Sequence, residues 1–284
     1  MIKNLINQNA IFSFKVARGS VRQRTELTEK LVEKIYRGIQ DYNTETNSDY
    51  ITKDKFETII HTKLPEDKSV KVQPIANAGK DTYEGFSDLD IDKNDNVLGH
   101  IIELNFRRKR FPLHDTFVFV HEMIHVLDKM INPKILTRMI NISSKLNNNN
   151  SFGSDINKYN NLYDSLYGDS YEKFTNETEK RQVLARHKDS IKRFLAKRAP
   201  QEKIDILQNL RYQLWLELHA YTIENDYIEK MGKSNNVDTS SIKTKVDKYL
   251  FEEKINMIKE LANKIIREER LKHKKKLIAN SSEH

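Results

Sequence analysis

Most hydrophobic positions in this chain recur at intervals of three or four residues, which places apolar side chains on one face of a helix. Segments with this pattern lie at 20–42, 50–62, 134–146, 176–199, 202–230 and 240–279. Residues 97–106, VLGHIIELNF, differ: they are apolar and rich in β-branched side chains, follow a polar stretch, and predict a strand. The pattern therefore predicts an α+β, predominantly α-helical fold, with a small sheet in its first half and long helices at its C-terminal end.

Breaks in this pattern suggest three parts. We expect an N-terminal helical segment over residues 1–75, a central domain over 76–232, and a C-terminal helix with a basic tail over 233–284. Prolines at 65 and 74 flank a short extended piece, and the run MGKSNN at 231–236 interrupts the helical pattern before the last helix.

The most informative stretch is residues 117–128, FVFVHEMIHVLD, in which His121, Glu122 and His125 form the pattern H-E-x-x-H. Residues four apart on a helix lie on one face, so two imidazoles at this spacing can bind one metal ion. Their neighbours are apolar, and burying two histidines and a glutamate there is costly unless they have partners. The alternative interpretation is a buried helix whose histidines are satisfied by internal hydrogen bonds.

This stretch resembles the active-site helix of zincin metallopeptidases, in which H-E-x-x-H lies among uncharged, mostly apolar residues. The resemblance covers residues 117–128 and implies a zincin-like domain over 76–232 that binds Zn²⁺ and hydrolyses peptide bonds in a protein or peptide substrate. His121 and His125 would be zinc ligands, and Glu122 the general base on the zinc-bound water. The strand at 97–106 would be an edge strand that pairs with an extended substrate.

A catalytic zinc ion has three protein ligands and a water, so one ligand is missing from this helix. The chain has no cysteine, which leaves histidine and carboxylate side chains. Glu179 matches the ligand helix of glutamate-type (gluzincin-like) zincins, in which a small or amide residue follows three positions later. Glu177 and Glu217 remain alternatives, Glu217 because its apolar neighbours demand a partner. His187 and His219 also remain candidates.

Further roles can be assigned around this core. Asp128, three residues after His125, is a candidate for orienting this histidine by a hydrogen bond without binding the metal itself. A position on the protein surface would equally explain an aspartate there. By resemblance to zincins, a Tyr or His should donate a hydrogen bond to the developing oxyanion, and Tyr221, His114 and His187 could do so.

Composition adds information on partners and location. The chain has 284 residues and a formal net charge of +8, and the basic positions from Lys264 to Lys276 could bind an acidic partner or nucleic acid. We expect no signal peptide, no transmembrane segment and no membrane partner, and therefore a cytoplasmic or virion-associated protein. The alternative to an endopeptidase is a structural or interaction protein, such as a virion component, that keeps a zincin fold with little or no activity.

Overall fold

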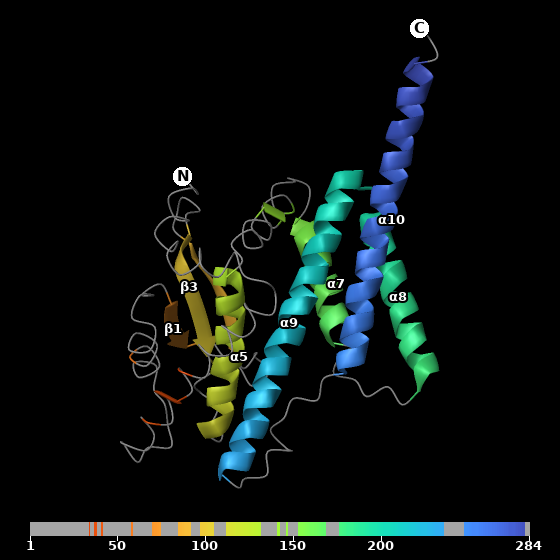
Figure 1. Ribbon diagram of the computed structural model, residues 1–284. Coiled ribbons are helices and arrows are strands. Elements are labelled where there is room, and N and C mark those ends of the chain that lie inside the picture. Colours follow the sequence, from red (N-terminus) through yellow and green to blue (C-terminus); the bar gives the residue numbers. More distant parts are fainter. Residues whose placement is uncertain are drawn as a thin grey trace. The chain divides into compact units, whose positions relative to one another are not determined.

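The computed structural model describes residues 70–74, 85–91, 97–104, 112–131, 153–168, 176–235 and 247–281, together with a few single positions (Figure 1). The chain forms two compact units, and the division falls within one long helix. Of the helices expected at 20–42 and 50–62, the structure describes only single positions, 34, 37, 38, 41 and 58, which are helical; apart from these and residues 70–74, the segment 1–75 lies outside the described residues. Of the helix expected at 134–146, the structure describes three positions, and Ile142 and Leu146 are buried.

The first unit contains a three-stranded mixed sheet. Its strands are β1 (Val70–Pro74), β2 (Gly85–Ile91) and β3 (Val97–Leu104), in the order β1-β3-β2. The predicted strand is therefore confirmed, but its expected place at the edge of the sheet is wrong. β3 pairs in parallel with β1 and antiparallel with β2, so both of its edges carry main-chain hydrogen bonds.

Helix α5 (Pro112–Ile131) packs against this sheet. A Cβ atom added to Gly85 on β2 would lie 2.7 Å from Val118 Cγ1, so the helix approaches β2 as closely as a glycine allows. At the other end of the helix, Lys129 Nζ donates a hydrogen bond to the main-chain oxygen of Ser87 at 3.0 Å. Both contacts hold α5 against the first residues of β2.

Helix α5 begins at Pro112. Proline suits a first helical position because its φ angle is already helical and its missing N–H group is not needed there. Asp115 and Thr116 therefore lie inside the helix rather than at its cap.

The second unit is a helical bundle. It contains α7 (Gly153–Gly168), α8 (Glu177–Leu195), the first part of α9 (Pro200–Asn235) and α10 (Lys248–Ser281). Buried apolar side chains from all four helices form one core that includes Leu166, Ile191, Leu214 and Phe251. The second part of α9, from residue 220 onward, belongs to the first unit. The predicted fold, α+β and predominantly helical, agrees with this architecture.

Side-chain caps mark the starts of two bundle helices. The side-chain oxygen of Asn176 accepts a hydrogen bond from the Glu179 N–H at 2.9 Å, as expected for a helix that starts near this residue. Asp247 accepts from the Leu250 N–H in the same way before α10. The bundle helices thus begin where short polar side chains can satisfy their first N–H groups.

Helix α7 was not predicted. Its sequence, rich in Tyr, Asn and Asp, was interpreted as a polar stretch between helices. Tyr159, Tyr163 and Tyr167 are spaced four residues apart, however, and four-residue spacing places side chains on one helix face. Tyr159 is buried and the other two pack against the bundle core, so the tyrosine rings add to the apolar surface that Leu162 and Leu166 provide on this helix.

The expected domain boundaries remain a prediction. Strand β1, placed in the N-terminal segment, pairs with β3, and α10, expected as a C-terminal part, shares the bundle core. The basic end of α10 carries exposed side chains, among them Arg267, Arg270 and Lys274. Among the helices that the structure describes, none has both the length and the apolar character needed to cross a membrane.

Candidate metal centre

The three residues of the H-E-x-x-H pattern lie together in the buried middle of α5. His121, Glu122 and His125 are 8%, 7% and 6% exposed. The apolar residues around them, among them Phe119, Met123 and Ile124, are fully buried, so the helix is enclosed on nearly every side. Because burial removes water as a partner, polar side chains at these positions need protein groups or an ion instead.

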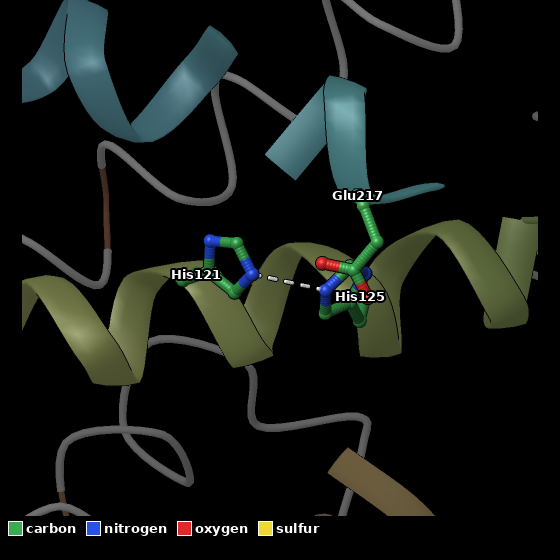
Figure 2. A group of neighbouring side chains, drawn as sticks. All are labelled: His121, His125 and Glu217. Carbon is green, nitrogen blue, oxygen red and sulfur yellow. Dashed lines mark hydrogen bonds between the residues drawn. The ribbon is translucent and has the colours of Figure 1, made fainter. Parts of the chain in front are cut away.

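The two histidines face each other. His121 Nε2 and His125 Nε2 are 3.1 Å apart, with the rings nearly perpendicular (Figure 2). Two nitrogens bound to one tetrahedral zinc ion, each at about 2.0–2.1 Å, would be about 3.3 Å apart. The two nitrogens are within hydrogen-bond distance of each other, and their separation is also close to that of two imidazole ligands on a single metal ion.

A buried carboxylate fixes the chemistry of the first histidine. His121 Nδ1 lies 2.9 Å from Glu224 Oε2, and Glu224 is itself 6% exposed. When the Glu224 carboxylate is ionised it can only accept hydrogen bonds, and Nδ1 is then the donor. In a neutral imidazole of this tautomer, the Nε2 atom, which faces His125, is the nitrogen whose lone pair can bind a metal.

Glu224 lies on α9, and the same helix carries a second carboxylate of the site, that of Glu217. Ligand atoms of His121, His125 and Glu217 all lie within 4.8 Å of one another, which is close enough for one metal ion (Figure 2). α9 runs without interruption through this region, and Glu217 lies about one turn before Tyr221. Tyr221 packs its ring on His121, with ring centroids 4.4 Å apart. The position of Glu217 therefore follows from the course of α9.

This grouping contains one of the two alternative third ligands, Glu217, and not the preferred one. Glu179 and Glu177 are not members of the group, although both are described. They lie in the first turn of α8, where a carboxylate interacts favourably with the helix dipole. Glu177 is also exposed and pairs with Lys180 at 3.9 Å. The grouping therefore favours Glu217, and the identity of the third ligand remains a prediction.

The remaining candidates are placed as follows. Among the described residues, His187 and His219 are outside the metal-compatible group, and the side chain of His114 lies outside the description. Asp128 is buried, at 6% exposure, which argues against the plain surface role, while its action on His125 remains a prediction.

Glu224 was not predicted as part of the site. Its sequence spacing does place it on the same helix face as another candidate: Glu217, Tyr221 and Glu224 follow one another at intervals of four and three residues, so they share one face of α9. Without the fold, nothing showed that this face would meet the histidines. The contact between Glu224 and His121 therefore could not be predicted from the sequence alone.

No protein-family model, no curated protein and no solved structure matches this chain. The functional conclusion therefore rests on the chemistry of the side chains themselves.

Proposed function

We propose that this protein is a zinc-dependent endopeptidase. The observation that carries the proposal is the facing pair His121 Nε2 and His125 Nε2, with Glu217 beside it and Glu224 on the far nitrogen of His121. Two histidines and one glutamate form one of the ligand sets used by catalytic zinc. A carboxylate on the outer nitrogen of a ligating histidine is the usual second layer of such a site.

Each residue then has a defined task. His121, His125 and Glu217 would hold the metal, and Glu224 would keep His121 in the tautomer that leaves Nε2 free to bind. Bound zinc would supply Lewis-acid chemistry at the scissile carbonyl and at the attacking water. Glu122 would accept a proton from the attacking water and return it to the departing amine.

Two further residues have proposed roles. Tyr221 packs against His121 from the helix that carries Glu217, so we favour its hydroxyl as the donor to the developing oxyanion. Asp128 remains our candidate for orienting His125. Neither role is needed for the metal to bind, and each can be tested separately from the ligands.

Substrate binding cannot use the strand first expected to do it. Both edges of β3 are paired, so an extended peptide cannot add to this strand. The proposed substrate remains a protein or peptide. The exposed basic end of α10 remains the place where we expect an acidic partner or nucleic acid, and the proposed location remains cytoplasmic or virion-associated.

The substitution Glu122→Gln tests the enzymatic proposal. It removes the base but keeps size and hydrogen-bonding capacity, and Glu122 is not a metal ligand. We expect unchanged zinc content and a rate of peptide cleavage lower by about 10²–10⁴-fold. A complex peptide mixture with products identified by mass spectrometry is a suitable substrate, because it requires no knowledge of specificity.

Glu229→Gln is the matched control, since Glu229 lies on α9 and pairs with the exposed Lys233. It should retain full activity. If the wild-type protein binds zinc but cleaves nothing, the alternative holds: a structural or interaction protein that keeps the metal without hydrolysis. If Glu122→Gln cleaves as fast as the wild type, Glu122 is not the base.

A further inference from the structure

Two tyrosines of α7 donate hydrogen bonds to successive positions on α9. Tyr159 Oη donates to Gln213 Oε1 at 3.0 Å, and Tyr163 Oη donates to Glu217 Oε1 at 3.1 Å. Donors and acceptors are each four residues apart, so the two bonds form consecutive rungs between the helices. The second rung ends on the residue that completes the metal-compatible group.

The rung at Tyr163 is held firmly in place. The ring of Tyr163 stacks on that of Tyr167 one turn later, with centroids 6.0 Å apart and an angle of 17° between the planes. Both rings pack against the bundle core. The hydroxyl therefore reaches Glu217 from a ring whose position is fixed by packing.

We propose that Tyr163 is a positioning residue for the metal ligand Glu217, an inference that rests on the zinc site proposed above. A carboxylate on a flexible side chain can rotate and present either oxygen, or both. A hydrogen bond to Oε1 restricts this rotation and directs Oε2 toward the ion. Such outer hydrogen bonds typically change metal affinity by 10–100-fold.

The first rung provides a matched control. Tyr159 also accepts a hydrogen bond from Asn209 Nδ2 at 2.6 Å, and burial raises its pKa above the ordinary value for tyrosine. Its acceptor, Gln213, is an amide that does not belong to the metal-compatible group. Tyr159→Phe and Tyr163→Phe therefore each remove one hydroxyl group from α7. Only Tyr163→Phe removes a hydrogen bond to the proposed metal ligand Glu217.

The test compares these two variants with the wild type by zinc affinity, measured in competition with a chelator, and by thermal unfolding of the metal-free proteins. We expect Tyr163→Phe to raise the zinc dissociation constant by about 10–100-fold. Tyr159→Phe should change it by less than about twofold while lowering the unfolding temperature. With Co²⁺ in place of zinc, the visible absorption spectrum should change in Tyr163→Phe and stay unchanged in Tyr159→Phe.

The outcomes separate the two proposals. If the wild type binds neither zinc nor Co²⁺, the metal site itself is wrong. If the wild type binds and both variants match its affinity and its Co²⁺ spectrum, the site stands and the role of Tyr163 is wrong. If both variants lose affinity equally, Tyr163 acts through the packing of α7 alone, and the positioning role is also wrong.

Discussion

Both units bury polar side chains, but the partners of these side chains differ. In the bundle, Lys254 is fully buried and its Nζ donates to the main-chain oxygen of Leu166 at 2.6 Å, near the C-terminal end of α7. A cation at this position satisfies a helix-end carbonyl and interacts favourably with the helix dipole. Around α5, the buried Glu224 contacts a histidine, and this histidine faces another.

The comparison separates structural from functional burial. Lys254 contacts the backbone, as expected of a residue that holds two helices together. Glu224 contacts the side chain of His121, and His121 faces His125. Ligand atoms of His121, His125 and Glu217 lie within 4.8 Å of one another, which is close enough for one metal ion.

Replacing Glu224 with Gln should reduce zinc affinity, and this effect should be larger than the effect on stability of replacing Lys254. The neutral amide oxygen accepts a weaker hydrogen bond from His121 Nδ1, so the imidazole is less basic and less well oriented. We expect zinc affinity to fall by about 10–100-fold, with the metal-free fold retained. Unaltered zinc affinity, measured by chelator competition, would show that Glu224 has only a structural role like that of Lys254.

Replacing Lys254 with Met should affect stability and leave the metal alone. The substitution keeps the aliphatic part of the side chain but leaves the Leu166 carbonyl without its Lys254 donor, which should lower the free energy of unfolding by about 1–3 kcal/mol. Chemical denaturation measures this change, and Lys259→Met, at an exposed position of the same helix, is the control. A loss of zinc affinity in Lys254→Met would break the distinction between the two kinds of burial.

Local patterns gave the right answer where the chemistry of one segment decides its structure. The strand at β3 and the helix carrying His121 and His125 have short, strong patterns, and the Asn176 cap marks the start of α8. The Tyr-rich helix α7 was missed because its few apolar residues, such as Leu162 and Leu166, and its tyrosine rings stand between many polar residues, which lowers the apparent hydrophobicity of the segment.

The third ligand depended on tertiary structure. Glu179 and Glu217 have comparable local patterns, and only the course of α9 past the histidines distinguishes them. The same holds for Glu224 and Tyr163, whose roles follow from contacts between residues 103 and 54 positions apart. No pattern within one helix contains this information.

Metal content tests the central claim most directly. Wild-type protein purified without chelators should contain about one zinc ion per chain by elemental analysis, and Glu217→Ala should contain little or none while remaining folded. Glu179→Ala, the same substitution at the ligand first preferred, should keep the wild-type content. A well-folded wild-type protein that binds no metal even after incubation with zinc would contradict the account, and loss of zinc from Glu179→Ala but not from Glu217→Ala would contradict its ligand set.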